Sequence, residues 1–169
     1  MGDLNWYAVY TSSRAEKKVK QRLDEQGIEN YLPLRTDLRL WSDRKKKVSV
    51  PLISGYIFVH TQMSEFSKIL NVVGVVAFLR EYSEFAVIPE NQITRLRMMV
   101  ENAADMVEFT TNPVHIGDTV IVERGNLKGL VGELVEILGK YKIAIRLQHF
   151  GCALLTIPAG WAKKIKCLP

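Results

Sequence analysis

The last third of the chain alternates short apolar runs with closely spaced glycines. Strand-like runs cover residues 114–122, 131–137, 142–147 and 154–157, and glycines stand at positions 117, 125, 129, 132, 139 and 151. Short strands joined by glycine turns favour a small barrel, because closure removes the exposed edges that an open sheet would leave. We therefore expect residues 114–169 to form a five-stranded, SH3-like β-barrel.

A short acidic segment precedes this region. Residues 104–113 hold two acids and no base, and the segment ends in Asn112-Pro113, a pair that disfavours continuation of a helix. We expect a linker there. The predicted domains are 1–103, followed by the linker at 104–113 and the barrel at 114–169.

The first hundred residues have a different pattern, in which strands and helices are mixed. Aromatic and β-branched runs predict strands over 6–10, 28–40, 55–60, 75–79 and 85–88. Ser13 followed by Glu16 predicts a capping box at the start of a helix that ends at Gly27. Helical patterns also occur over 65–72 and from Pro89 to Ala103. The order indicates an α+β domain, with an antiparallel sheet flanked by helices.

Positive charge is concentrated in two blocks. The formal net charge is +5, residues 14–47 hold eleven bases against six acids, and residues 114–169 hold eight against four. Within the first block, one row at helical spacing (Arg14, Lys18, Arg22) and one hairpin tip (Arg44, Lys45, Lys46, Lys47) are the candidate nucleic-acid contacts. The alternative for both is a solvated surface. A flexible basic tip points either into water or toward phosphates.

Patterns that would indicate catalysis are absent from the sequence. No phosphate-binding loop, nucleophile elbow or zinc-protease motif occurs, and the three histidines lack a partner at useful spacing. Cys152 and Cys167 form neither a disulfide framework nor a zinc site. We expect no enzyme activity, no catalytic residue, no metal, no cofactor, no small-molecule substrate and no membrane span. Two idle thiols are typical of a reducing cytoplasm, which is the expected location.

Three N-terminal segments resemble one family of transcription factors. Residues 6–10 (WYAVY), 14–19 (RAEKKV) and 52–59 (LISGYIFV) are similar to the N-terminal domain of the NusG–RfaH family of elongation factors. The C-terminal region resembles the family's KOW motif at five positions (Gly117, Asp118, Gly125, Gly129, Gly132). The resemblance covers residues 6–166, and the chain is most similar to the specialised UpxY-like antiterminators of polysaccharide operons.

The resemblance implies binding without catalysis. The N-terminal domain of the family docks on the clamp helices of the large RNA polymerase subunit, opposes pausing or termination, and contacts the non-template DNA strand in specialised members. The family's apolar docking surface corresponds here to four aromatic residues (Tyr10, Tyr56, Phe58, Phe78), for which the alternative is a place in the sheet core. Where RfaH carries a second polymerase contact, this chain reads Ser64-Glu65-Phe66-Ser67, a departure that leaves that contact open.

The KOW domain of the family recruits a second partner, either Rho or a small-subunit ribosomal protein. The resemblance places this contact near Phe150. Two other functions stay open at this point. One is a ribosome-associated, RNA-binding KOW protein, and the other is an enzyme acting on nucleic acid. The sequence leaves open the target operon, the DNA element, the oligomeric state, and whether the KOW domain masks the docking surface or switches its fold.

Overall fold

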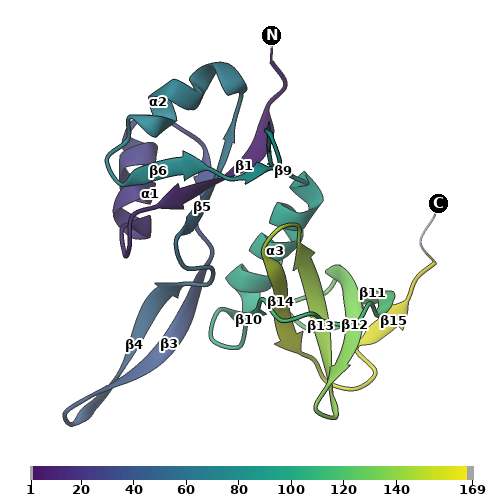
Figure 1. Cartoon of the computed structure of the whole chain (residues 1–169). Coiled ribbons are helices and arrows are strands. Elements are labelled where there is room, and N and C mark those ends of the chain that lie inside the picture. The colour runs from purple at the N-terminus through teal and green to yellow at the C-terminus, as the bar shows by residue number, and fades with distance from the viewer. Residues whose placement is uncertain (1, 167–169) are drawn as a thin grey trace. The chain divides into compact units, whose positions relative to one another are not determined.

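The computed structural model describes residues 2–166 and divides into two compact units. Unit 1 comprises residues up to 33 together with 53–90, and unit 2 comprises 34–52 together with 91 onward. Figure 1 labels the elements of both units. All strand pairs in both units are antiparallel. The result is a mixed fold of antiparallel sheets and few helices.

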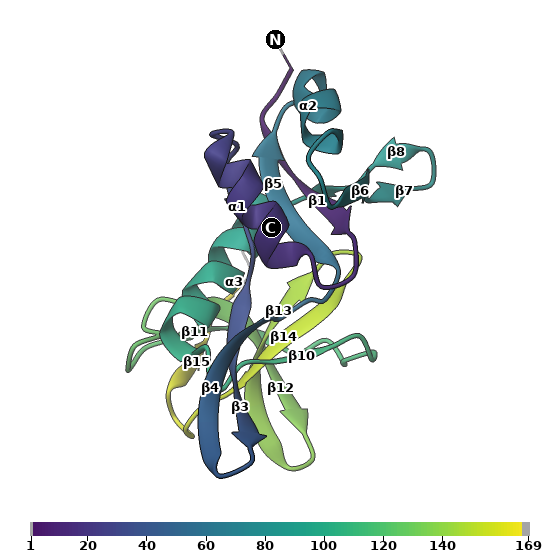
Figure 2. The same ribbon diagram turned by 90° about the vertical axis from the view of Figure 1, so that its left-hand side faces the viewer.

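Unit 1 is built around a five-stranded sheet with the order β2-β5-β1-β6, in which β9 also pairs with β1. Its strands are β1 (Asn5–Thr11), β2 (Asn30–Tyr31), β5 (Tyr56–Thr61), β6 (Val75–Phe78) and β9 (Val87–Ile88). The helical elements are α1 (Glu16–Glu25), the 3-10 turn η1 (Met63–Glu65) and α2 (Phe66–Leu70). A small hairpin of β7 (Arg80–Glu81) and β8 (Glu84–Phe85) follows β6 (Figure 2).

The start of α1 differs from the sequence prediction. The helix begins at Glu16 with Ala15 as its N-terminal cap, and no side chain caps it. The predicted capping box of Ser13 and Glu16 is therefore wrong. The Glu16 carboxylate is buried and accepts a hydrogen bond from the Gly55 N–H at 2.7 Å. Glu16 therefore bonds to Gly55, which is distant in the chain, instead of taking part in a cap of its own helix.

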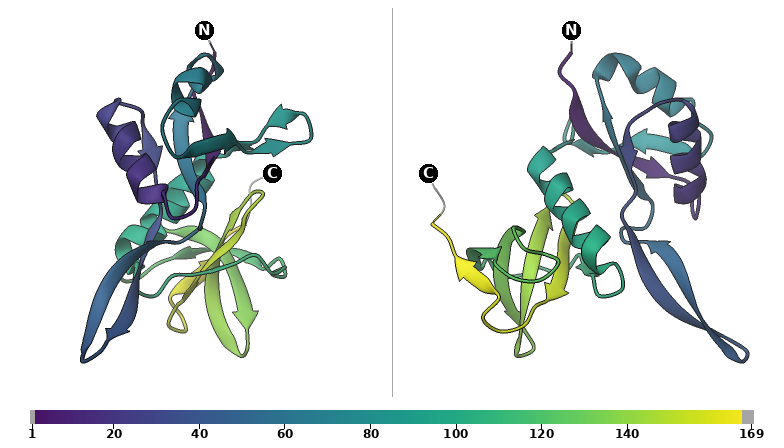
Figure 3. Two further views of the ribbon diagram at one scale, coloured as in Figure 1. Left: turned by 60° about the vertical axis from the view of Figure 1, so that its left-hand side comes forward. Right: turned by 180° about the vertical axis from the view of Figure 1, so that it is seen from behind.

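The region predicted as one strand over 28–40 is interrupted. β2 ends at Tyr31 and β3 (Leu34–Trp41) begins after Leu32 and Pro33. Proline lacks a backbone N–H and cannot donate to a sheet ladder, so the break at Pro33 has a local cause. β3 then pairs only with β4 (Arg44–Pro51), which makes a separate two-stranded ribbon. Figure 3 shows this ribbon as two long strands joined by a tight turn.

Unit 2 contains this ribbon, the helix α3 (Glu90–Ala103) from Asn91 onward, and a six-stranded sheet with the order β10-β14-β13-β12-β11-β15. The sheet strands are β10 (Glu108–Thr110), β11 (Asp118–Val122), β12 (Val131–Ile137), β13 (Lys140–Leu147), β14 (Gly151–Thr156) and β15 (Ala162–Lys164). The Thr36 N–H donates to the Ala104 carbonyl at 2.8 Å and joins the ribbon to the end of α3. Five of these strands, β11 to β15, lie within the range for which five strands were predicted, and β10 adds a sixth from outside it.

The sixth strand comes from the segment predicted as a linker. Residues 108–110 form β10 and pair with β14, so 104–113 is not an open connection. That 104–113 separates two domains stays a prediction. The two compact units are divided elsewhere, because 34–52 and 91–103 group with the C-terminal sheet. The segment was hard to recognise because a three-residue strand carries almost no periodicity. Cys167, assigned to the C-terminal domain, lies outside the described residues.

Candidate functional site

Two of the four predicted docking aromatics meet at the surface of unit 1. Tyr10 on β1 and Tyr56 on β5 are direct partners in the strand register. Their ring centroids lie 4.9 Å apart in an edge-to-face arrangement, and 47% of Tyr10 is exposed. Partial burial, with a smaller contribution from Tyr10, raises the pKa of the Tyr56 hydroxyl. The pair forms an aromatic patch at the surface of unit 1.

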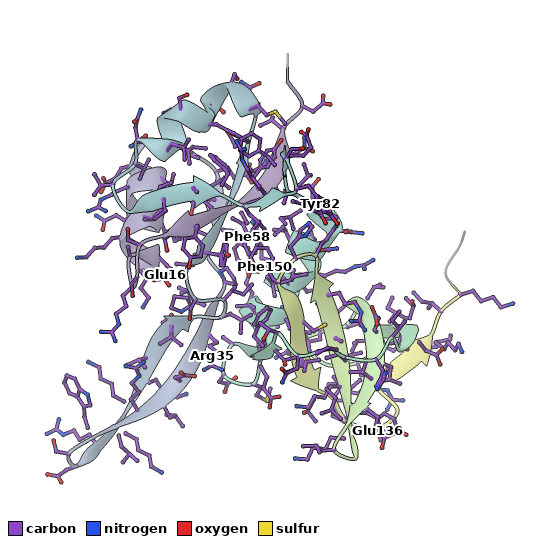
Figure 4. All side chains as sticks on the ribbon, in the orientation of Figure 1. Glu16, Arg35, Phe58, Tyr82, Glu136 and Phe150 are labelled. Atoms are coloured by element: carbon purple, nitrogen blue, oxygen red, sulfur yellow. The ribbon has the colours of Figure 1, made fainter. Side chains whose placement is uncertain are left out.

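The other two aromatics lie in the core. Phe58 is fully buried and stacks with Tyr31 at 6.5 Å. Phe78 is 6% exposed and stacks against Phe66 with ring centroids 3.9 Å apart, with Tyr7 packed on its edge. Phe58 and Phe78 therefore lie in the sheet core, which was the alternative to a docking role. Of the four predicted docking residues, Tyr10 and Tyr56 remain as candidates. Figure 4 labels Phe58 among the side chains of the chain.

A buried carboxylate, which the sequence did not reveal as functional, holds the loop beside the tyrosine pair. Glu16 is 6% exposed and accepts the Gly55 N–H, while the Gly55 carbonyl accepts the Thr11 N–H at 2.8 Å. Gly55 has a φ of +83°, a conformation that favours glycine. Because Gly55 directly precedes Tyr56, Glu16 fixes the start of β5 and so the position of the tyrosine pair. Nothing in the sequence distinguishes Glu16 from an ordinary glutamate in the first turn of a helix.

Only two of the three bases predicted to form a row on α1 lie on this helix. Arg14 precedes the helix, in a turn where its φ is +59°. Lys18 is exposed on the helix. Arg22 donates from Nη1 to the Val73 carbonyl at 2.6 Å and so holds the turn after α2. The three bases do not form one helical row, and one of them has a structural contact within unit 1.

The basic run on the ribbon lies in the strand β4 and not in the turn. Trp41 pairs directly with Arg44, so the turn consists of Ser42 and Asp43 alone. Every position from Arg44 to Lys47 belongs to β4 and is exposed. Successive side chains of a strand point to opposite faces, so the four bases divide two and two. The prediction that these bases form the polar tip itself is wrong, because the strand ladder continues to its last possible pair.

The glycines of the predicted KOW motif have structural tasks in the C-terminal sheet. Gly125 has a φ of +73°, and a Cβ there would lie 2.2 Å from the Trp161 ring. A Cβ on Gly117 would lie 1.9 Å from the Leu134 carbonyl oxygen. Gly129 lies in the turn before β12 and Gly132 lies within β12. Each tight approach excludes a larger residue, so the motif specifies the fold of this sheet.

The remaining motif residue, Asp118, takes part in a set of ion pairs within the same sheet. Its carboxylate lies 2.8 Å from Lys164 on the neighbouring strand β15. Lys163 lies 3.5 Å from Glu123. Lys142 on β13 is 8% exposed and pairs with Glu108 on β10. Of the three lysines near the C-terminus (Lys163, Lys164 and Lys166), two are thus paired with acids of the same region.

Arg146 and Glu133 form the best-connected ion pair of this sheet. Arg146 Nε lies 2.7 Å from one Glu133 carboxylate oxygen and Nη2 lies 3.0 Å from the other. The same Nη2 donates to the carbonyls of Val114 and His115 at 2.9 and 3.0 Å, and Glu133 accepts the Gly117 N–H at 3.2 Å. Donating these hydrogen bonds to the Glu133 carboxylate raises the pKa of the guanidinium. The pair attaches the segment that enters β11 to the middle of the sheet.

Beside this segment lies an open groove of about 700 Å³ within unit 2. The Lys142–Glu108 pair lies in its wall, together with the exposed side chains of Ile116 and Leu138. Phe150, the predicted partner contact, is half-buried elsewhere, in the turn between β13 and β14. Over residues 2–166 no group of three or more His, Cys, Asp or Glu side chains could hold a metal ion. None of the helices described is long and apolar enough to cross a membrane.

Comparison with known proteins decides the family. A family model described as "Transcription termination factor nusG" matches residues 4–97, more than half of the chain. The chain belongs to the NusG family. The NusG "Transcription termination/antitermination protein" of Staphylococcus carnosus is 27% identical over 168 residues, covering 89% of this chain and 90% of that protein. The NusG of Halalkalibacterium halodurans is 27% identical over 164 residues, covering 87% and 90%.

A solved NusG structure shares the fold. The structure titled "Domain interaction in Thermotoga maritima NusG" aligns with a TM-score of 0.53 and 18% identity, covering 97% of this chain and 98% of that one. The NusG family match includes Tyr10, Glu16 and Tyr56, as well as the whole ribbon. It ends within α3, so the KOW assignment of the C-terminal sheet depends on the motif residues described above.

Proposed function

We propose that this chain is a transcription elongation and antitermination factor that docks on the clamp helices of RNA polymerase through the Tyr10–Tyr56 patch. The observation that carries the proposal is an edge-to-face pair of tyrosines at the surface, with Tyr10 47% exposed, in the region that matches the NusG family. Tyrosine is enriched among the residues that dominate binding energies, because its ring buries a large area at low cost in side-chain entropy. The buried Glu16 keeps the pair in position before binding.

The basic residues supply the DNA contact in this proposal. Lys18 on α1 and the four bases of β4 contact phosphates of the non-template strand and of the nearby duplex. Phosphate contacts position a protein on DNA without reading its sequence. By holding polymerase and non-template strand together, the factor suppresses pausing or termination. Specialisation of the UpxY type is part of this proposal, and it predicts recruitment only where a particular DNA element is exposed.

The C-terminal sheet supplies the second partner contact in this proposal. We propose that it is a KOW barrel, that it has no catalytic role, and that it recruits Rho or a small-subunit ribosomal protein near Phe150. The pairing of Lys163 with Glu123 and of Lys164 with Asp118 supports this choice over an RNA-binding, ribosome-associated protein. Bases already occupied by acids attract phosphates less than free ones.

Affinity purification of the tagged full-length chain from its native host tests the docking proposal. We expect RNA polymerase subunits to co-purify, and either Tyr10→Ser or Tyr56→Ser to reduce recovery at least about tenfold. The matched control is Tyr82→Ser, since Tyr82 is 98% exposed in the β7–β8 hairpin of the same unit. Recovery of ribosomes without polymerase would support the ribosomal function instead. Equal recovery with all three variants would exclude the tyrosine pair as the docking surface.

A further inference from the structure

The ribbon β3–β4 exposes large apolar side chains that its fold does not require. Leu38, Leu40 and Trp41 are 66%, 76% and 73% exposed. The ribbon pairs with no other strand of the described chain, so both of its faces are open near the turn. A two-stranded ribbon is marginally stable in water. Apolar side chains that stay exposed to water add nothing to its stability. Such groups mark binding surfaces.

The strand register sorts these side chains onto two chemically different faces. Trp41 is opposite Arg44, and Arg39 is opposite Lys46, so these four side chains share one face, here called the tryptophan face. Leu40 is opposite Lys45, and Leu38 is opposite Lys47, so these four share the other, here called the leucine face. In Figure 4 the side chains of the ribbon extend outward on both sides, with Arg35 labelled at its base.

The tryptophan face has an uneven charge. Three bases share this face with one indole ring, and none of the three makes an ion pair within residues 2–166. The next acid along this face, Asp37, lies 3.3 Å from Arg35 and is already paired. Asp43 in the turn is the other nearby acid. The leucine face carries two lysines and two aliphatic side chains, which offer no ring for stacking.

We propose that the tryptophan face binds an unpaired stretch of nucleic acid, with the Trp41 ring stacked on a base and with Arg39, Arg44 and Lys46 on the flanking phosphates. An exposed ring beside cations on one face matches a single strand, because unpaired bases expose the faces that a duplex keeps stacked. The inference rests on the proposed DNA contact and adds to it a particular face, a stacking residue and a single-stranded target.

Charge-matched double variants of the full-length chain separate the two faces. Arg39→Gln with Lys46→Gln removes two charges from the tryptophan face, and Lys45→Gln with Lys47→Gln removes two from the leucine face. The probe is a fluorescently labelled oligothymidine strand, compared with a duplex of the same length. We expect the first pair to weaken single-strand binding at least about tenfold more than the second, and to lower the salt slope by roughly 0.7 per lost phosphate contact. Equal losses would overturn the proposal in favour of a diffuse charge effect.

Trp41→Leu tests stacking directly, because it keeps an apolar side chain and removes the ring. Trp6 is 4% exposed and Trp161 is half-buried, so Trp41 is the most exposed indole of the three. We expect oligothymidine to quench tryptophan fluorescence in the wild type, and Trp41→Leu to abolish most of the quenching and weaken binding roughly tenfold or more. Leu38→Ser with Leu40→Ser is the control and should leave both signals unchanged.

Three results would contradict the proposal. They are tighter binding to the duplex than to the single strand, unchanged quenching in Trp41→Leu, and loss of binding in the leucine-face variant alone. The last result would indicate that the leucines bind the probe or support the ribbon. Polymerase recovery from the same variants separates this inference from the proposed function. Trp41→Leu should still bring down polymerase, whereas Tyr10→Ser should still quench with oligothymidine.

Discussion

The ribbon β3–β4 and the sheet β10–β15 both carry many bases but use them differently. In the sheet, Lys142, Arg146, Lys163 and Lys164 each pair with an acid on another strand or loop. In the ribbon, the five bases from Arg39 to Lys47 make no ion pair with any described residue. Four bases of the sheet are thus paired with neighbouring acids, whereas none of these five bases of the ribbon is.

This difference separates charge that supports a fold from charge that is available to a ligand. A paired base has already given up part of its hydration and is held in one geometry, so a phosphate must displace its partner. A base without an acidic partner keeps its hydration, and a phosphate can contact it without displacing an acid. The ribbon is therefore the better candidate for a polyanion contact, although both regions belong to basic blocks of the sequence. The following predictions test this distinction.

Removal of the central ion pair of the sheet should have the largest effect. Arg146→Met leaves Glu133 without its bidentate partner and the carbonyls of Val114 and His115 without their donor. We expect the free energy of unfolding to fall by about 2–4 kcal/mol, measured by urea denaturation. Lys163→Met removes an exposed pair of the same sheet and should cost less than about 0.5 kcal/mol. A loss in Arg146→Met as small as that in Lys163→Met would mean that the Arg146–Glu133 pair has no structural role.

An opposite-charge pair introduced into the ribbon should stabilise the ribbon and weaken its binding to nucleic acid. Lys46→Glu places a carboxylate directly opposite Arg39. We expect the ribbon to gain roughly 0.2–1 kcal/mol, because an opposite-charge cross-strand pair replaces two like charges. Hydrogen exchange of the β3 and β4 amides measures this gain. Binding to oligothymidine should weaken in the same variant, and stronger binding would contradict the distinction between paired and free bases.

The smallest effect should come from the thiol of Cys152, which lies buried in the sheet. Burial raises the pKa of this thiol, an effect that Arg146 partly opposes. A group with a raised folded pKa contributes its full stability below the unfolded value and loses it as pH rises through the folded value. The unfolded thiol ionises near pH 8.5. Between pH 8 and pH 10 the wild type should therefore lose more stability than Cys152→Ala, and the ribbon amides should respond equally in both proteins.

Much of the fold could be predicted from local patterns. The strand at 131–137, the helix that ends before Gly27 and the long helix up to Ala103 follow periodicity and glycine or proline signals. The family resemblance, drawn from three short segments, is confirmed by the match over residues 4–97. The errors concern elements too short to have a period, such as β10, and ends that tertiary contacts decide, such as the start of α1.

The candidate site was harder to predict because it depends on burial and on distant partners. Period-two alternation correctly placed Tyr56 and Phe58 on one face of a strand, yet Phe58 is fully buried and Tyr56 is half-exposed. The partners of Glu16 and of Lys142 are 39 and 34 positions away in the chain. A single sequence gives no signal for either contact.

The sequence by itself determined which residues alternate, where glycines permit tight turns, and which bases stand next to each other. These are local properties, fixed by backbone geometry over a few residues. Only the tertiary structure decided which face of a strand is covered and which charges meet. The four bases from Arg44 to Lys47 are one run in the sequence, but strand pairing divides them between two faces. Strand pairing and packing bring together residues far apart in the chain, and burial and charge pairing are set by those distant neighbours.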